Sequence, residues 1–286
     1  MQHWAKYVVE VDVVGYFDHV NHDWLRKFLR HRVNDGGLLR LIDRWLKAGV
    51  MENGVVTRAE DGTPQGGPAS PVLANVYLHY VLDLWFERRF KRTCQGWTEL
   101  TRYADDFVAA FQDREDAQRF RREVEERLAA FGLQVAPEKT AVLRFDGTLL
   151  NARGRPAVRP ASFTFLGFIH FLTKTREGKL NIVRTPSIKA RERFIHSVAA
   201  WLKVNRHEPV RVQQAHLILA LNGYYQYFGL RLCQPALNAV HRRVRRTWQR
   251  TLRRRSQRAR RTCDWATLDG KSWFQLPKPR LTHVWV

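Results

Sequence analysis

Residues 100–111 read LTRYADDFVAAF, and this stretch decides which fold the sequence predicts. Apolar residues lie on both sides of two adjacent carboxylates, Asp105 and Asp106, and this pattern predicts a β-hairpin with the acids at its tip. A third acid, Asp12, stands near the end of the apolar run 5–14, whose many β-branched residues are typical of a strand buried on both faces. A carboxylate at the end of a buried strand is costly unless it is paired or bound to a metal. We therefore expect the three acids to converge at one edge of a sheet.

Three carboxylates contributed by two strands form a hard-oxygen site that suits Mg²⁺. Two such ions, held about 3.5–4 Å apart, would activate an attacking hydroxyl group and stabilise a leaving pyrophosphate. Taken alone, Asp12 is better explained as a strand-end residue, and Asp105 with Asp106 as a solvated turn. The loop Thr63–Ser70 and the aromatic residue Phe17, which lie between them in the sequence, favour the metal site.

Length and composition exclude several classes of protein. The chain has 286 residues, a length typical of about two domains. Hydrophobic residues make up 44% and charged residues 27%, which excludes a collagen, a low-complexity tail and a wholly disordered chain. No run reaches the roughly 18 apolar residues of a membrane-spanning helix, and no signal peptide is visible. The three cysteines, Cys94, Cys233 and Cys263, lie far apart, so neither a disulfide framework nor a zinc site is expected.

The charge is divided very unevenly along the chain. Residues 1–150 contain 21 basic and 22 acidic residues, whereas residues 151–286 contain 28 and 5. The second part therefore has a net charge of +23 and the first part a net charge of −1. A field this positive indicates a polyanionic partner. We expect that partner to be nucleic acid rather than a membrane, and the protein to be cytoplasmic, in the nucleoid or in a ribonucleoprotein particle.

Hydrophobic periodicity predicts a mixed α/β part followed by a wholly helical part, with the change near 175–186. Capping residues and glycines, among them Asn21, Asp113 and Gly132, mark the ends of helices. In the first part, helices are expected after Asn21, over 37–48, from Pro71 to about Lys91, and between Asp113 and Gly132. Strands are expected over 133–135, 140–145 and 163–171, and the helices of the second part over 187–204, 209–228 and 235–255.

These motifs, in this order, resemble those of the group II intron-encoded reverse transcriptase and maturase family. The resemblance covers nearly the whole chain, and the ordered set is specific, although a four-residue motif alone is weak. The matching segments are VDVVGYFDHV at 11–20 and GTPQGGPASPVLANVYLH at 62–79 (first and second palm motifs), YADD at 103–106, GLQVAPEKT at 132–140, FTFLGF at 163–168 (primer grip), LNGYYQYF at 221–228 (maturase or thumb signature) and LPKPRL at 276–281 (C-terminal tail).

The resemblance implies an α+β fold with two domains. Residues 1–180 would form a reverse-transcriptase palm, an antiparallel sheet with helices, and residues 181–286 an all-α thumb/maturase domain with a basic C-terminal helix and tail. The implied function is an RNA-directed DNA polymerase that extends a DNA primer on an RNA template with dNTPs. Binding of intron RNA would also assist splicing. No HNH endonuclease motif is visible after the helical part, and assembly as a homodimer is left open.

The family carries a fingers region before its first palm motif, whereas only eleven residues precede Asp12 here. We therefore expect a chain whose fingers are missing or are supplied from elsewhere. The alternative function is a catalytically inactive, fingerless remnant that acts only as an intron RNA-binding or maturase protein.

The resemblance also assigns roles to single residues of the catalytic centre. Asp12, Asp105 and Asp106 are the implied ligands of two Mg²⁺ ions. Phe17 is implied to be an aromatic gate whose ring leaves no room for a ribose 2′-hydroxyl. Packing in the core beside Tyr16 is the alternative role for Phe17.

Three further residues are implied to contact the nucleotide. Gln65 and Gly66 resemble the floor of the nucleotide pocket, where glycine lets the backbone approach a ligand closely, and a generic Pro-Gly turn is the alternative. Lys139 is implied to protonate or neutralise the departing pyrophosphate, with a solvated surface lysine as an equal alternative. Asp18 is expected to be a structural cap rather than a metal ligand. Val14 stands where the family often has lysine, a change with no obvious catalytic cost.

The basic region near the C-terminus contains eleven arginines and no acid between Pro235 and Cys263. Its apolar residues recur at helical spacing, which predicts one packed face with arginines around the rest of the helix. Like charges four residues apart repel each other, so we expect a phosphate backbone to neutralise them, with a solvated face as the alternative. The rings of Tyr224 and Tyr225 can stack on RNA bases or equally well fill a helix core. The arginines expected to bind RNA are Arg242, Arg245, Arg246, Arg250 and Arg253.

Overall fold

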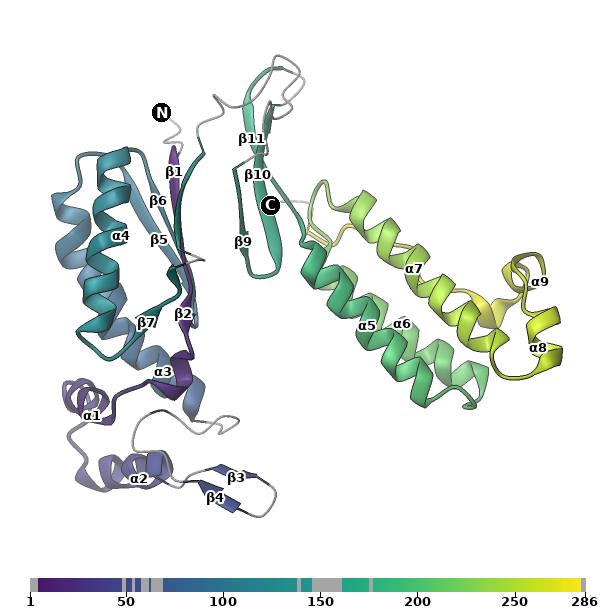
Figure 1. Cartoon of the computed structure of the whole chain (residues 1–286), viewed down its shortest axis with the longest axis horizontal. Helices are drawn as coiled ribbons and strands as arrows, with labels where there is room; N and C mark the ends of the chain where they lie inside the picture. The colour runs from purple at the N-terminus through teal and green to yellow at the C-terminus, as the bar shows by residue number, and fades with distance from the viewer. Residues whose placement is uncertain are drawn as a thin grey trace. The chain divides into compact units, whose positions relative to one another are not determined.

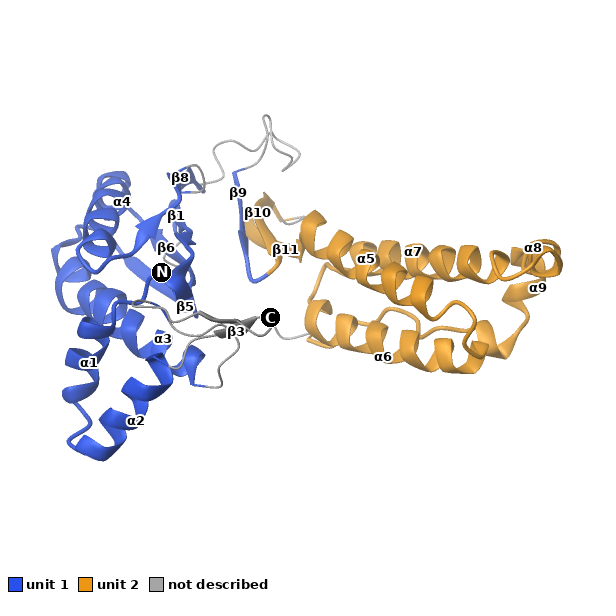
Figure 2. Cartoon of the chain, turned by 60° about the horizontal axis from the view of Figure 1, so that its bottom comes forward, with its two compact units in different colours: residues 1–166 blue, residues 167–286 orange. Residues whose placement is uncertain are grey.

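The computed structural model describes residues 5–47, 50–52, 55–57, 62, 69–137, 140–145, 161–174 and 177–283. The chain divides into two compact units, which Figure 2 shows in blue and orange. Unit 1 is Met1–Leu166 and unit 2 is Gly167–Val286. Nowhere in the described ranges is a helix both long and apolar enough to cross a membrane.

Unit 1 is built on an antiparallel sheet with the strand order β5-β6-β1-β8. The hairpin predicted from residues 100–111 is the pair β5–β6, so this expectation is confirmed. The helix α4 (Arg114–Ala129) packs against the sheet, and Figure 1 shows it lying along one face. The strands are β1 (Tyr7–Val11), β5 (Thr98–Tyr103), β6 (Asp106–Phe111) and β8 (Ala141–Arg144).

The strand predicted over 5–14 is divided into two strands at Asp12. β1 pairs with β6 and β8, whereas β2 (Val13–Val14) pairs with β7 (Gln134–Val135). The carbonyl of Asp12 accepts a hydrogen bond of 2.9 Å from the amide of Ala136, beside β7. The chain therefore changes partners at Asp12, which places this acid at the end of the buried strand, as the sequence predicts.

Two helices of unit 1, α1 (His22–Arg30) and α4, begin at the capping residues identified in the sequence. The side chain of Asn21 accepts hydrogen bonds from the amides of Asp23 and Trp24, and Asp113 caps α4 in the same way. At the other end of α4, Gly132 has a φ of 78°, a left-handed conformation that glycine adopts without strain. The remaining elements are the 3₁₀ turns Tyr16–Asp18 and Lys91–Thr93, α2 (Gly36–Lys47), α3 (Ser70–Leu78), and the paired strands β3 (Val50–Glu52) and β4 (Val55–Thr57).

The long helix expected from Pro71 to about Lys91 is present, but it is not α-helical throughout. After α3, the chain forms two π-helical turns, His79–Asp83 and Phe86–Phe90. A π-helical turn contains an extra residue, and such turns occur frequently at functional sites. Aromatic side chains from this run pack on the sheet, with the ring centroids of Phe90 and Phe120 only 5.3 Å apart. These contacts hold the helix run against α4 and β6.

Unit 2 starts with an antiparallel hairpin and continues with helices. The hairpin consists of β10 (Phe168–Lys174) and β11 (Leu180–Pro186). The expected domain boundary at 180/181 falls at the start of β11, whereas the structure groups the whole hairpin with the helices. The helices are α5 (Ile188–Val204), α6 (Val210–Phe228), α7 (Gln234–Arg253), α8 (Gln257–Thr262) and α9 (Trp265–Asp269), followed by the 3₁₀ turn Ser272–Phe274.

The core of unit 2 contains the apolar stripe predicted on its basic helix. Trp248 on α7 is fully buried, its indole N–H donates a 2.8 Å hydrogen bond to Gln213 on α6, and its ring stacks on Phe274. Gln213 is itself fully buried and donates to the carbonyl of Asn205. These bonds satisfy the buried indole N–H of Trp248 and the buried side-chain amide of Gln213. The stripe residues Leu237, Val240, Val244 and Leu252 are all buried beside them.

Candidate active site and nucleic-acid interface

The turn between β5 and β6 carries two of the three predicted metal ligands. Tyr103 pairs with Asp106, so Ala104 and Asp105 form a two-residue turn. Ala104 has a φ of 55°, a left-handed conformation that is strained for a residue with a side chain. Strain of this kind persists only where the surroundings hold the backbone in place.

The strand register brings the third acid to the same place. In the β1–β6 ladder, Val11 pairs with Phe107, and the next position along would set Asp12 opposite Asp106. Directly opposite residues of antiparallel strands have Cβ atoms about 4.5–5.5 Å apart. If the ladder continued by one position, Asp12 would face Asp106 at the ends of β1 and β6, and a shared metal site there stays a prediction.

The electrostatics of Asp106 show the same convergence. Burial raises the pKa of this carboxyl group, and the negative charges of Asp105 and Asp12 raise it further. The amide of Leu166, which follows β9 (Ser162–Phe165), opposes this by donating a 3.3 Å hydrogen bond to the carboxylate. Glu10 on β1 also has a raised pKa, caused first by burial and then by the charges of Asp106 and Asp12. A divalent cation bound near Asp106 would offset the neighbouring negative charges that help to raise its pKa.

The donor set fits Mg²⁺ by its chemistry. Within the described ranges, no three His, Cys, Asp or Glu side chains are already gathered around one metal position. In proteins, Mg²⁺ usually keeps several water ligands and binds through one or two carboxylates together with substrate phosphates. All three acids are half-buried, so each keeps access to solvent and ligand.

Phe17 lies in the short 3₁₀ turn that follows Asp12. Its neighbour Tyr16 is buried and donates a hydrogen bond to the carbonyl of Ala74 on α3, whereas Phe17 itself is only half-buried. The two ring centroids are 5.4 Å apart. Tyr16 thus anchors the turn in the core, and Phe17 keeps an accessible surface, which a gate requires.

Gly62, the first residue of the second palm motif, packs against this turn. Its φ of 91° is left-handed, its amide donates to the carbonyl of Val20, and its carbonyl lies 2.5 Å from Nε2 of His22. A Cβ atom at this position would come within 2.9 Å of the carbonyl oxygens of Phe17 and Asp18, which is too close for any side chain. The motif therefore starts next to Phe17. Gln65, Gly66 and Lys139 lie outside the described residues, and their roles stay predictions.

Sequence reasoning missed a cation at the same turn. Arg102, only 13% exposed, forms a two-pronged ion pair with Asp83, with donor–acceptor distances of 2.8 and 2.6 Å. It also donates to the side chain of Asn75 and to the carbonyl of Ala104. Its side-chain partners Asp83 and Asn75 lie 19 and 27 residues away in sequence, so the sequence signals only a basic residue beside the acidic turn.

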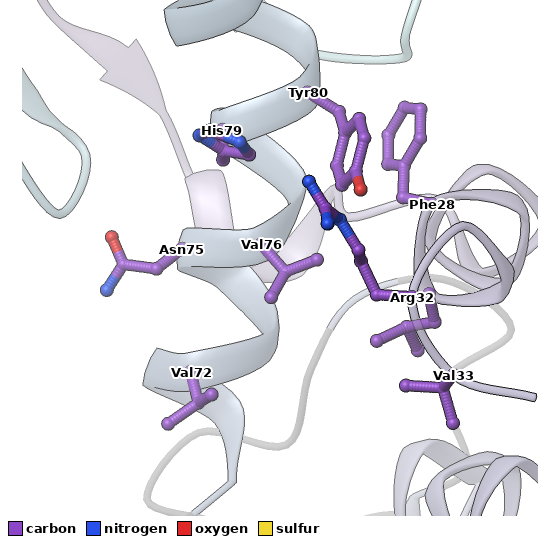
Figure 3. Close-up of a pocket in the computed structure, with 9 residues that line it drawn as sticks. Phe28, Arg32, Val33, Val72, Asn75, Val76, His79 and Tyr80 are labelled. Atoms are coloured by element: carbon purple, nitrogen blue, oxygen red, sulfur yellow. The ribbon is translucent and has the colours of Figure 1, made fainter. Parts of the chain in front are cut away.

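A mainly apolar cavity of about 540 Å³ lies between α1 and α3 (Figure 3). Phe28, Val33 and Val76 contribute much of its lining, and Arg32 and His79 stand at its edge. Val72 on α3 is 63% exposed beside it.

The predicted RNA-binding arginines fall into two groups. Arg242, Arg246, Arg250 and Arg253 are exposed and lie four, four and three residues apart, along one face of α7. We call these four residues the arginine row. Arg245 differs from them, because it forms an ion pair with Asp269 and lies 5.3 Å above the ring of Trp265. Its guanidinium group already has partners within unit 2, which argues against a primary role in binding RNA.

The far end of the arginine row lines a basic depression of about 780 Å³. A surface of this composition suits several phosphate groups at once, because guanidinium groups bind phosphate oxygens in pairs. The depression is lined by Arg206, Arg250, Arg253, Arg254, Ser256, Gln257 and Arg260.

The structure corrects the expectation that two tyrosines stack on RNA bases. Tyr224 is 6% exposed and Tyr225 is fully buried. The ring of Tyr224 packs 4.4 Å from that of Phe194, and the hydroxyl of Tyr225 lies 3.1 Å from Nδ1 of His241. Burial also raises the pKa of both hydroxyl groups. The two rings fill the core between α5, α6 and α7, so their faces are not available to a base.

Comparison with known proteins identifies the family. The model of the family "Reverse transcriptase (RNA-dependent DNA polymerase)" matches residues 2–170. Protein YkfC of Escherichia coli K12 is 30% identical over 226 residues, which cover 69% of this chain and 55% of that protein. The group II intron-encoded protein LtrA of Lactococcus lactis subsp. cremoris is 43% identical over 84 residues, which cover 28% of this chain and 14% of that protein.

Among solved structures, telomerase from Candida albicans in complex with a fragment of telomeric RNA has a TM-score of 0.45 and 11% identity, over 94% of this chain and 50% of that chain. The chain spans about half the length of YkfC. The matched residues 2–170 include Asp12, Phe17, Asp105 and Asp106. The chain belongs to the reverse transcriptase (RNA-dependent DNA polymerase) family, and over 84 residues it is similar to a group II intron-encoded protein.

Proposed function

We propose that this chain is the RNA-directed DNA polymerase of a group II intron, which extends a DNA primer on an RNA template by transferring nucleotidyl groups from dNTPs. The proposal is supported by the acidic turn between β5 and β6, where the charges of Asp105 and Asp12 act on Asp106. Continued by one position, the register of β1 and β6 would set Asp12 opposite Asp106, and the charges of Asp105 and Asp12 raise the pKa of Asp106. The family model that matches this part of the chain supports the same chemistry.

Asp12, Asp105 and Asp106 would hold two Mg²⁺ ions. When bound, these ions lower the pKa of an attacking hydroxyl group and stabilise the charge on a leaving pyrophosphate. The carboxylates lie near the ends of β1 and β6, which are interior strands of the sheet and therefore held on both sides. From this rigid support they would orient the reacting groups. Phe17 excludes a ribose 2′-hydroxyl from the nucleotide position.

Gln65 and Gly66 would form the floor of the nucleotide pocket, the role that the resemblance of their motif implies. Lys139 donates a proton to the departing pyrophosphate or neutralises its charge.

Unit 2 binds intron RNA in this proposal and thereby assists splicing. The arginine row and the basic depression supply the positive surface. Phosphate contacts of this kind fix the position of a nucleic acid without reading its sequence. Affinity for a particular intron would therefore come from the shape of its folded RNA.

The test is DNA synthesis by the full chain on an RNA template with a DNA primer and dNTPs. We expect extension in Mg²⁺, loss of extension when EDTA removes the metal, and recovery when Mg²⁺ is added back in excess. RNA binding, measured in the same buffers, should continue in EDTA, because the arginine row needs no metal. Binding of RNA without extension at any Mg²⁺ or Mn²⁺ concentration would contradict the polymerase and leave only an RNA-binding protein.

Phe17→Val is expected to relax the choice of sugar. A smaller side chain opens the space for a 2′-hydroxyl group, so incorporation of ribonucleotides relative to deoxyribonucleotides should rise by about 10- to 200-fold, the range typical of a changed fit in a pocket. Single-nucleotide incorporation kinetics with matched dNTP and rNTP measure this ratio.

The control for this change is Phe28→Val, which shortens a buried ring of the α1 core. It should lower the melting temperature and leave the sugar ratio unchanged. A Phe17→Val protein that loses stability at an unchanged ratio would show that Phe17 is only a core residue.

A further inference from the structure

Arg102 connects the acidic turn to the long helix run of unit 1. Its Nε and Nη2 atoms bind the two carboxylate oxygens of Asp83 at 2.8 and 2.6 Å. Its Nη1 atom donates to Oδ1 of Asn75 at 2.8 Å and to the carbonyl oxygen of Ala104 at 2.9 Å. Only 13% of the Arg102 side chain is exposed, and its bonds to Asp83 and to the carbonyl of Ala104 are partly buried. Charge-assisted, two-pronged pairs of this kind hold their geometry better than single bonds do.

The bond to Ala104 acts on the peptide group that controls the direction of Asp105. The carbonyl of Ala104 belongs to the peptide plane between the two central residues of the turn. Rotation of this plane changes ψ of Ala104 and φ of Asp105 and converts one turn type into another. The same rotation would redirect the side chain of Asp105. Because Ala104 is already held at a φ of 55°, the turn needs an external contact to keep this conformation.

The π-helical turn brings the two anchors of Arg102 together. Asn75 and Asp83 are eight residues apart, and in a regular α-helix this spacing turns the second side chain about 80° away from the first. The π-helical turn His79–Asp83 takes up one extra residue and brings both side chains to the guanidinium group. Figure 3 shows Asn75 pointing away from α1, whereas Val76 and Tyr80 point toward it. The π-helical turn therefore lets Asn75 and Asp83 both bind the guanidinium group that contacts the carbonyl of Ala104.

We propose that Arg102 is a positioning residue for the reverse transcriptase centre: through Asp83 and Asn75 it holds the Ala104 carbonyl, and with it the direction of the Asp105 carboxylate. The inference rests on the proposed polymerase function. Arg102 acts through the turn, and it needs no contact with substrate for this role.

Arg102→Lys is the decisive variant, because lysine keeps the charge but cannot bind Asp83, Asn75 and Ala104 together in one plane. We expect kcat for nucleotide addition to fall by about 100-fold, as for a small misplacement of a catalytic group. KM for dNTP should change little, since the turn is not part of the proposed nucleotide floor. Asp83→Asn removes the two-pronged pair and should produce the same pattern.

The matched control is Arg127→Lys. Arg127 on α4 is also half-buried, donates to the carbonyl of Val81 in the same helix run, and lies 4.4 Å above the ring of Phe131, but it does not contact the turn. The Arg127→Lys variant should therefore lower the melting temperature about as much as Arg102→Lys does and leave kcat unchanged.

Two readouts stand apart from polymerase activity. Hydrogen exchange of the peptide covering 98–111 should become faster in Arg102→Lys and stay unchanged in Arg127→Lys. Binding of Mn²⁺, followed by electron paramagnetic resonance, should weaken about tenfold in Arg102→Lys. If the parent chain binds Mn²⁺ but does not synthesise DNA, the polymerase proposal fails, while these two readouts still test the role of Arg102. If Arg102→Lys changes neither the hydrogen exchange of 98–111 nor the Mn²⁺ affinity, the positioning role is overturned. This holds whatever the loss of melting temperature.

Discussion

Asp105→Asn is expected to abolish DNA synthesis, with a loss of about a thousandfold or more. Asparagine has almost the same size as aspartate but no charge, so the change removes a hard anionic ligand and leaves the backbone of the turn in place. Metal ions at such a centre stabilise the transition state by several kcal/mol, and each 1.36 kcal/mol corresponds to about a tenfold change in rate. Single-turnover primer extension in Mg²⁺ measures the loss.

Stability should move in the opposite direction to activity in this variant. The charge of Asp105 raises the pKa of Asp106, which means that the two carboxylates repel each other in the metal-free protein. Removing one charge relieves this repulsion, so the melting temperature in EDTA should stay the same or rise. RNA affinity should stay within a few-fold, because the proposed phosphate contacts lie in unit 2.

Asp113→Asn is the matched control for Asp105→Asn. Asp113 follows β6 at the end of the strand opposite to the catalytic turn, and its side chain caps α4. Asparagine caps helices about as well as aspartate, so both stability and activity should survive. Residual extension by Asp105→Asn within tenfold of the parent would contradict the assignment of this carboxylate.

The elements that place the three acids could be predicted because their signals are local. Alternating apolar residues around Asp105 define the hairpin, and Asn21 and Asp113 cap helices through bonds to their own following residues. The end of the strand at Asp12 followed from the cost of burying a charge. Each of these inferences depends on residues within a few positions of one another, which is the range at which sequence patterns carry structural information.

The features that could not be predicted depend on contacts between distant segments. Arg102 contacts Asp83 and Asn75 because the hairpin packs on the helix run. The π-helical turn that aligns these two residues has no characteristic amino-acid composition by which a sequence could reveal it. Burial of Tyr224 depends on its contact with Phe194, thirty residues earlier. The aromatic spacing was equally consistent with a helix core and with an RNA-stacking face.

The arginines of α7 show the same limit of sequence reasoning. Arg245 and Arg246 are adjacent in sequence and identical in type, yet among the described residues only Arg245 has an acidic partner and an aromatic ring beneath it. The helix turns by about 100° between successive residues, so neighbouring arginines face different surroundings. Packing of the unit therefore decides which arginines can bind phosphate. The residues to replace are the exposed ones of the arginine row.

Replacing the whole arginine row with glutamine, Arg242, Arg246, Arg250 and Arg253 together, is expected to weaken RNA binding strongly at low salt and equally for unrelated RNA sequences. Each phosphate contact contributes about 0.7–0.9 to the slope of log affinity against log salt concentration, so the slope should flatten by about 3. Filter binding between about 50 and 200 mM salt measures the slope, and this is the range in which such contacts have a large effect.

The control lies on the same helix. Arg243 and Arg245 form ion pairs with Glu192 and Asp269, so their replacement by glutamine removes two positive charges whose partners are inside unit 2. We expect that double variant to lose thermal stability and to keep most of the salt slope. If the slope instead falls equally in both variants, RNA responds to the total charge of the unit rather than to the face of α7 that carries the row. An unchanged slope after removal of the row would mean that this face contacts no phosphate. The next set to replace would then be the arginines that line the basic depression outside the row, Arg206, Arg254 and Arg260.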